Sequence, residues 1–173
     1  MSVTVRLVNA EQARELAPEL AGVLMDCVEG GASVSFLAPL EPAKAEAYWL
    51  GVADGVASGE RMLLVAEDAA ERVVGTVQIL LRQPENQPHR ADVSKMLVHR
   101  SARRQGIGEK LMRMAEDAAL LARKTVLVLD TASGEAERLY ERLDWVRVGV
   151  VPGFALLPNG EPCDTCFFYK SLL

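Results

Sequence analysis

One short turn restricts the fold of this chain more than any other feature, because it joins an apolar strand to an amphipathic helix. The turn is Arg103–Gly108, with the sequence Arg-Arg-Gln-Gly-Ile-Gly. A helix start exposes unpaired N–H groups and about half a positive charge, so it binds anions. Gly106 and Gly108 allow the backbone to approach a pyrophosphate, and Arg103 and Arg104 add positive charge beside it. The turn therefore predicts a pyrophosphate-binding site.

Other interpretations of this turn stay open from the residues alone. A dinucleotide-binding fingerprint requires a third glycine where the chain has Leu111, although Asp130 lies at the distance expected of its ribose-binding carboxylate. A P-loop requires Gly-Lys-Ser/Thr, whereas Gly108 is followed by Glu109 and Lys110. A glycine-rich turn before a surface helix, with two solvated arginines, is a further alternative.

Length and composition limit the classes of protein to consider. A chain of 173 residues, half of them hydrophobic and a quarter charged, predicts one domain, residues 1–173, with a buried core. The net charge of −5 argues against general nucleic-acid binding. Met1–Val8 alternates as a strand containing Arg6 and does not resemble a signal peptide, and no apolar run is long enough to span a bilayer. We therefore expect a cytoplasmic protein with no nucleic-acid or membrane partner.

Apolar periodicity and turn residues predict the order of the elements. The predicted strands are Val3–Val8, Arg61–Glu67, Arg72–Leu81, Arg90–Val98, Thr125–Leu129, Trp145–Val151 and Cys163–Lys170. The predicted helices are Asn9–Val28 with a break or kink at Pro18, Pro42–Gly59, Ile107–Arg123 and Ser133–Leu143. Asn9 and Gln12 are spaced as a capping box. A hairpin region combined with a strand–helix–strand crossover predicts a mixed sheet with helices on both faces, an α/β (α+β) fold.

The pattern Arg-x-x-Gly-x-Gly after a strand resembles the acetyl-CoA signature of the GNAT superfamily of N-acetyltransferases, and the element order resembles that fold from end to end. The resemblance implies a mixed, mostly antiparallel sheet whose splayed strands hold acetyl-CoA as cosubstrate. In the family, the main chain of the strand before the signature binds the pantetheine arm. The residues implied in coenzyme binding are Met96, Leu97, Val98, Arg103, Arg104, Gln105, Gly106, Ile107, Gly108 and Ser133.

Two further details extend the resemblance. The strand Arg90–Val98 alternates imperfectly, and a β-bulge near Ser94–Lys95, which family members often have, would reconcile the pattern. Several stretches are similar to the tabtoxin-resistance acetyltransferases within the superfamily. They are Gly30–Val34, Lys95–Val98, Ser101–Arg103, Leu129–Thr131 and Val148–Gly153.

Tyr140 is the predicted acid of the implied reaction. Acetyl transfer to an amine requires a proton for the leaving thiolate, and family members have a tyrosine here that points at the coenzyme sulfur. A phenol with a pKa near 10 is suited to protonating a thiolate of similar basicity. The competing interpretation is a tyrosine packed into an apolar helix face with Ala136, Leu139 and Leu143.

Two aspartates are candidates for catalysis and for substrate binding. Asp130 ends the strand after the signature helix, and Asp92 lies on the strand before it. If the two carboxylates face one another across the splayed strands, like-charge repulsion raises a pKa and favours a base. Otherwise they hold the acceptor's ammonium while water removes the proton, and solvated strand-end aspartates are the third alternative. His99 is expected to be a surface residue.

Two further predictions concern the wall of the acceptor site and the state of the cysteines. Ser33, Ser35 and Phe36, in the loop Gly30–Leu40, are expected to line the acceptor side, because this loop covers that side in the family fold; an ordinary connecting loop is the alternative. The cysteines are Cys27, Cys163 and Cys166, and the lone CxxC spacing has no second pair, so we expect free thiols and no metal.

The favoured hypothesis is direct acetyl transfer from acetyl-CoA to a primary amine of a small molecule. The acceptor would be an amino acid or an amino-acid-like antibiotic, and the subgroup resemblance points to a β-lactam toxin. The alternatives are a protein or peptide acetyltransferase acting on lysine or an N-terminus, and a non-catalytic coenzyme A-binding sensor. The chain is expected to be a monomer or a homodimer.

Overall fold

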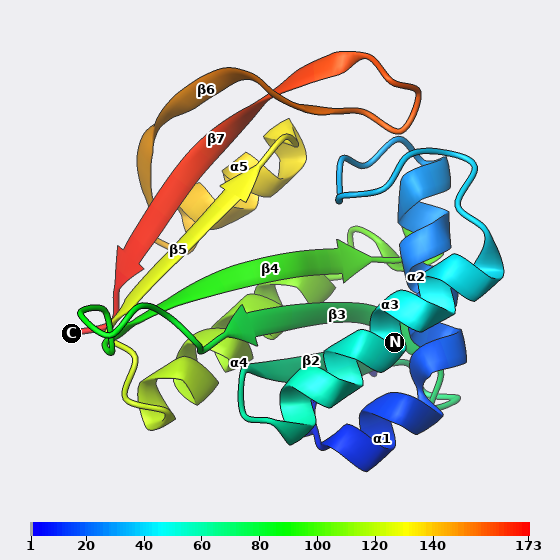
Figure 1. The fold of residues 1–173 in the computed structure, drawn as a ribbon, viewed down its shortest axis with the longest axis horizontal. Helices are drawn as coiled ribbons and strands as arrows, with labels where there is room; N and C mark the ends of the chain where they lie inside the picture. The colour runs from blue at the N-terminus through cyan, green and yellow to red at the C-terminus, as the bar shows by residue number, and fades with distance from the viewer. Residues whose placement is uncertain (1) are drawn as a thin grey trace.

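A seven-stranded mixed sheet forms the centre of the computed structural model, which describes residues 2–173. Met1, counted above in the first strand run, lies outside the described residues. The strand order is β1-β2-β3-β4-β5-β7-β6, and every neighbouring pair is antiparallel except β4 with β5 (Figure 1). The strands are β1 (Thr4–Val8), β2 (Arg61–Glu67), β3 (Val73–Leu80), β4 (Arg90–Val98), β5 (Val126–Thr131), β6 (Val146–Leu156) and β7 (Pro162–Ser171). The helices are α1 (Ala10–Glu15), α2 (Ala17–Glu29), α3 (Pro42–Ala57), α4 (Ile107–Leu121) and α5 (Gly134–Arg142), with a 3₁₀ turn at Arg100–Ala102.

The predicted fold class and element order are confirmed. Strands β2 and β4 have the predicted bounds. The capping box is present, because the Asn9 side chain accepts from the Gln12 N–H and the Gln12 side chain accepts from the Asn9 N–H. The first predicted helix breaks at Leu16, since Pro18 lies in the first turn of α2, where a missing N–H removes no helical hydrogen bond.

The last hairpin differs from the prediction. The strand expected at Trp145–Val151 continues to Leu156 as β6. Pro152 and Gly153 resemble a turn in sequence, but the strand passes through them as an irregularity in its pairing with β7. Gly153 adopts a φ of 61°, a left-handed conformation that favours glycine, so the strand bends there without ending.

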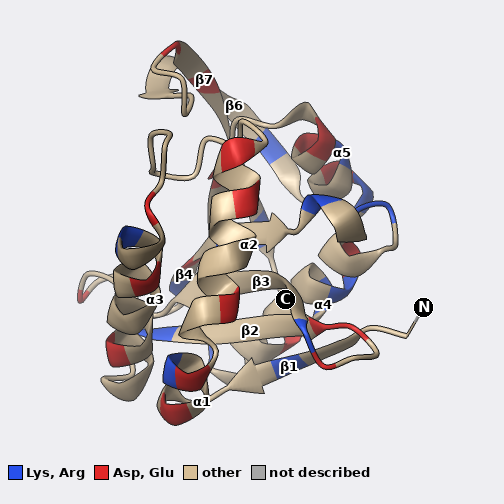
Figure 2. Ribbon diagram, turned by 90° about the vertical axis from the view of Figure 1, so that its right-hand side faces the viewer, with Lys and Arg blue, Asp and Glu red and all other residues tan. Residues whose placement is uncertain are grey.

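Helices cover the sheet on both faces, and each face has its own core. Figure 2 shows α1, α2 and α3 on one side of the sheet and α4 and α5 on the other. Trp49 of α3 is fully buried in the first core, and Leu111 of α4 is fully buried in the second. Full burial of such a side chain stabilises the fold by roughly 1.5–3 kcal/mol. The two cores pack the sheet between two helical layers.

Strands β4 and β5 diverge, as the splayed-strand prediction requires. They pair in parallel only from Arg90 opposite Val126 to Asp92 opposite Val128. Beyond that point β4 continues along β3 and β5 continues along β7, and Figure 1 shows the two strands spreading apart. The edge of β4 that faces β5 therefore has unpaired main-chain groups over its second half.

Candidate active site

A β-bulge shapes the splayed half of β4. Gln78 lies opposite Ser94 and Thr76 opposite Leu97, so β4 has one more residue than β3 over this interval. Lys95 takes up the extra residue with a φ of 52°. The bulge predicted at Ser94–Lys95 is thereby confirmed, and it redirects the strand at the mouth of the splay.

The end of β4 offers main-chain groups to a ligand. The His99 N–H donates to the Val74 carbonyl of the adjacent chain at 2.8 Å. Because main-chain groups alternate between the two edges of a strand, Leu97 also faces β3, whereas Met96 and Val98 face the splayed edge. Of the three residues predicted to bind the pantetheine arm, the geometry therefore favours Met96 and Val98. Leu97 is buried in the core beneath α2 and α3.

The turn before α4 gathers unpaired N–H groups. Within residues 2–173, none of the N–H groups of residues 104–109 donates a hydrogen bond, and the first helical bond runs from the Lys110 N–H to the Gly106 carbonyl. Arg104 and Gly106 are left-handed, with φ of 61° and 74°. Alternating left- and right-handed residues form a concave nest of N–H groups, which is an anion-binding structure. The geometry fits the pyrophosphate of coenzyme A.

The two glycines of the turn have different structural roles. Gly106 requires its left-handed conformation, and a Cβ placed on it would meet nothing within 4 Å. A Cβ on Gly108 would lie 3.0 Å from the Leu139 Cδ2. The missing side chain at Gly108 therefore serves the contact between α4 and α5, as well as any approach of a phosphate.

Arg103 joins the turn to the end of β4. Its Nε donates to the Val98 carbonyl at 3.1 Å, and its Nη2 lies 3.8 Å from the Cys27 Sγ. Burial raises the pKa of the Cys27 thiol although the Arg103 charge opposes this, so the thiol is neutral near pH 7. Arg104 and Gln105 are exposed beside the N–H nest. Ser133 caps α5 by accepting a hydrogen bond from the Ala136 N–H.

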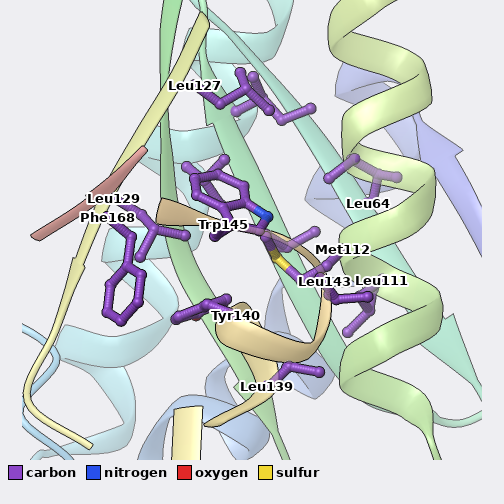
Figure 3. Close-up of a cluster of buried hydrophobic side chains, with 14 of the residues drawn as sticks. Leu64, Leu111, Met112, Leu127, Leu129, Leu139, Tyr140, Leu143, Trp145 and Phe168 are labelled. Carbon is purple, nitrogen blue, oxygen red and sulfur yellow. The ribbon is translucent and has the colours of Figure 1, made fainter. Parts of the chain in front are cut away.

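Tyr140 is packed as its apolar helix face predicts, with 4% of its surface exposed. Its ring centroid lies 5.9 Å from that of Trp145 and 5.7 Å from that of Phe168, and Figure 3 shows it directed from α5 toward Phe168. Its hydroxyl has no hydrogen-bond partner within residues 2–173. Burial, with the nearby Asp130 charge, raises the pKa of Tyr140 above its usual value. The hydroxyl therefore stays protonated and free to donate, while the acid role remains a prediction.

The structure gives the two aspartates different surroundings. Asp130 is exposed at the end of β5, and its Oδ2 accepts from the Thr165 Oγ1 at 2.7 Å. Asp92 forms an ion pair with Arg90 and accepts from the Gln83 Nε2 at 3.2 Å. Each carboxylate therefore has its own partner, and the Asp92 charge is balanced by a guanidinium within the paired half of β4.

The loop predicted to form the acceptor wall contacts the β6–β7 hairpin. The Ser33 Oγ donates to the Leu156 carbonyl at 3.0 Å, and the Ala38 N–H donates to the Pro158 carbonyl at 2.9 Å. Figure 1 shows this loop beneath the hairpin tip, on the side toward which β4 and β5 spread. Phe36 packs edge-on against Tyr48 of α3, with ring centroids 5.3 Å apart. We name the two joined segments, residues 30–40 and 156–162, the loop–hairpin bridge.

Five polar residues gather on the same side, and only Ser35 among them was predicted there. The Lys95 Nζ donates to the Ser35 Oγ at 2.8 Å and lies 5.9 Å from the centre of the Tyr48 ring. Gln78, fully buried on β3, joins Arg61 to Tyr48 through its amide. The sequence signal for this cluster was a glutamine and a lysine within otherwise apolar strands. Their meeting point is Tyr48 of α3, which contacts Gln78 and the Lys95 of the bulge only in the folded chain.

The potential metal ligands of the described residues, cysteines and histidines among them, have other surroundings than a metal site. Residues 2–173 contain no group of three or more His, Cys, Asp or Glu side chains placed to hold a metal ion. Cys27, Cys163 and Cys166 are free thiols. His99 accepts from the Ser101 N–H and caps the 3₁₀ turn. No helix within those residues is long and apolar enough to cross a membrane.

Comparison with known proteins identifies the class that this fold and site define. The family model of the acetyltransferase (GNAT) domain matches residues 59–147, just over half of the chain. The chain belongs to the GNAT acetyltransferase family. GNAT enzymes use acetyl-CoA as cosubstrate, and this protein is an acetyl-CoA-dependent acetyltransferase.

Solved structures share the whole fold at low sequence identity. An N-acetyltransferase from Staphylococcus aureus Mu50 is 18% identical with a TM-score of 0.81, covering 100% of both chains. A phosphinothricin acetyltransferase from Sinorhizobium meliloti in complex with acetyl-CoA is 17% identical with a TM-score of 0.78, covering 99% of this chain and 89% of that one. A ribosomal-protein-alanine N-acetyltransferase from Brucella melitensis is 22% identical with a TM-score of 0.78, covering 97% and 99%. These likenesses establish the shared fold and leave the acceptor open.

Proposed function

We propose that the protein transfers acetyl directly from acetyl-CoA to a primary amine of a small molecule, with residues 1–173 acting as one acetyltransferase domain. The observation that carries the proposal is the loop–hairpin bridge, which is closed by the hydrogen bonds from Ser33 and Ala38. The bridge lies on the side toward which the strands splay, and we expect it to hinder an extended peptide from lying across that side. An open hollow of about 380 Å³ at the end of β5 adjoins Asp130, because Thr165 both lines the hollow and donates to the Asp130 Oδ2.

The chain's own groups fit the coenzyme. Met96 and Val98 would bind the pantetheine arm through their main chain, and the N–H groups of residues 104–109 would bind the pyrophosphate beside Arg104. Bound acetyl-CoA supplies the acetyl group as an activated thioester. Ser133 and Gln105 would contribute further polar contacts at the starts of α5 and α4.

Asp130 and Tyr140 would act on the two sides of the transferred group. The Oδ1 of Asp130, which has no partner within residues 2–173, would hold the acceptor's ammonium while Thr165 fixes the other oxygen, and water would remove the proton. Tyr140 would donate its hydroxyl proton to the departing sulfur. For Asp92, the ion pair with Arg90 favours a role in holding the closed end of the splay over a role as a second carboxylate.

The acceptor class follows from the resemblance to the tabtoxin-resistance acetyltransferases. It points to an amino acid or an amino-acid-like antibiotic, a β-lactam toxin among them. The fold shared with a phosphinothricin acetyltransferase is compatible with this class.

The test is thiol release from acetyl-CoA by the purified protein, with free amino acids, simple amines and lysine-containing or free N-terminal peptides as acceptors. We expect release with small amines and none above background with peptides. Release with peptides alone would overturn the small-molecule acceptor, and coenzyme binding without any turnover would indicate a sensor.

A further inference from the structure

The acceptor side of the splay contains a chain of hydrogen bonds whose direction is fixed by its first member. An arginine can only donate, so the Arg61 Nη1 donates to the Gln78 Oε1 at 2.8 Å. The Gln78 Nε2 must then face Tyr48 and donate to its hydroxyl oxygen at 3.0 Å. The Tyr48 hydroxyl proton is left free to donate onward. Burial raises the pKa of Tyr48, so this proton is retained.

The Ser35 hydroxyl, like that of Tyr48, is left with a proton to donate. The Lys95 ammonium can only donate, so the Ser35 Oγ accepts from its Nζ at 2.8 Å and keeps its own proton available. Lys95 lies over the Tyr48 ring. The ammonium and the Ser35 hydroxyl thus lie beside the tyrosine that ends the first chain, and all three groups offer protons.

Among the described residues, no ion pair balances the positive charges of this cluster, although the Asp130 charge acts on Lys95 from beyond ion-pair distance. Within residues 2–173, neither Lys95 nor Arg61 has a carboxylate within ion-pair distance, and the buried Nε of Arg61 has no hydrogen-bond partner. Burial lowers the pKa of Lys95 and the Arg61 charge adds to this, while Asp130 acts in the opposite direction. A cationic cluster that is rich in donors and poor in acceptors favours an anion.

We propose that Lys95, Tyr48 and Ser35 form a receptor for a carboxylate on the acceptor, so that the enzyme selects amines that carry an acid group. This inference rests on the proposed function. The ammonium of such an acceptor would meet Asp130, whose charge is within electrostatic range of both Lys95 and Tyr140. Opposite charges on the two sides of the splay match the two charges of a free amino acid.

Matched acceptors and variants test the receptor. The acceptors are L-amino acids and their carboxamides, which keep the amine and lose the acid. Lys95→Met keeps the length of the side chain and removes its charge, and Tyr48→Phe removes one donor. Lys44→Met is the control, because Lys44 is an exposed lysine of α3 outside the proposed receptor, and its ammonium lies over a different ring, 5.8 Å from the centre of Phe36. Melting temperatures close to wild type verify that each variant is folded.

We expect wild type and Lys44→Met to prefer the acid over its carboxamide in kcat/KM. Lys95→Met should lose about tenfold to a hundredfold on the acid, mainly through KM, with little change on the carboxamide. Tyr48→Phe should lose less in the same direction. Equal use of acid and carboxamide by wild type, or an equal loss on both in Lys95→Met, would overturn the receptor.

A binding measurement separates this inference from the proposed reaction. Calorimetric titration of the same acids and carboxamides into the protein with coenzyme A present requires no turnover. Binding of acids that depends on Lys95, in a protein that acetylates none of them, would support the receptor and count against the proposed function. Binding of acids that is unchanged in Lys95→Met would overturn the receptor whatever the turnover.

Discussion

At the scale of single residues, Tyr140 combines a packed ring with an unpartnered hydroxyl, and removing the hydroxyl separates its two roles. Tyr140→Phe keeps the contacts with Trp145 and Phe168, so we expect an unchanged melting temperature and a roughly 10²–10⁴-fold fall in kcat. Because burial raises the pKa of Tyr140, its hydroxyl stays protonated through the neutral range. Loss of this proton should therefore not lower the kcat of wild type below about pH 10. Tyr169→Phe, at an exposed position, is the control. A kcat within a factor of two of wild type would leave Tyr140 a core residue.

Asparagine variants distinguish the role of Asp130 from that of Asp92, because kcat and KM are measured for each. Asparagine at 130 still accepts from Thr165, so Asp130→Asn should fold normally and raise the acceptor KM about tenfold or more, with a smaller effect on kcat. Asp92→Asn loses the ion pair with Arg90 and should lower the melting temperature with little effect on KM. The measurement is kcat and KM from pH 6 to pH 9. Near-wild-type kinetics in Asp130→Asn would remove it from the site.

At the scale of elements, Asp26 ties α2 to the end of β4. Its Oδ2 accepts from the Arg100 N–H at 2.8 Å, and its Oδ1 accepts from the Arg100 Nε at 3.0 Å. Partial burial opposes ionisation, but these bonds and the positive charge of Arg100 hold the pKa of Asp26 below its usual value.

A carboxylate with a lowered pKa stabilises the fold above its unfolded pKa, and the effect is lost as pH falls through the folded pKa. We therefore expect Asp26→Asn to be about 1–3 kcal/mol less stable than wild type at pH 7. The gap should close as the pH falls below 4. Urea denaturation at several pH values measures it, and a gap that is constant with pH would exclude this electrostatic role.

The turn before α4 is the second element with a specific expectation. Gly106→Val forces a branched side chain into a left-handed conformation and distorts the N–H nest. Acetyl-CoA should raise the melting temperature of wild type, because a ligand that binds the folded state stabilises it, and the shift should be small or absent in Gly106→Val. Gly149→Val, where a Cβ meets nothing and φ is not left-handed, is the control. A full shift in folded Gly106→Val would contradict the role of the turn.

At the scale of the whole molecule, local patterns predicted most of the elements, and they also supplied the residues that we propose for coenzyme binding. The imperfect alternation of β4 is a local signal that predicted the observed bulge, and the family resemblance carried by the turn Arg103–Gly108 implied the observed splay. The acceptor side depends on contacts between distant segments. Lys95 meets Ser35 across 60 residues, and Ser33 meets Leu156 across 123. No local periodicity encodes such contacts, so the receptor emerged only from the folded chain.

The most direct test of the account is one competition reaction containing acetyl-CoA, a mixture of free amino acids, and lysine-containing and free N-terminal peptides. Mass spectrometry then identifies which amines carry the acetyl group. The account predicts acetylated small amines with wild type, loss of that product with Tyr140→Phe, and unmodified peptides throughout. Acetylated peptides beside untouched amino acids would contradict it.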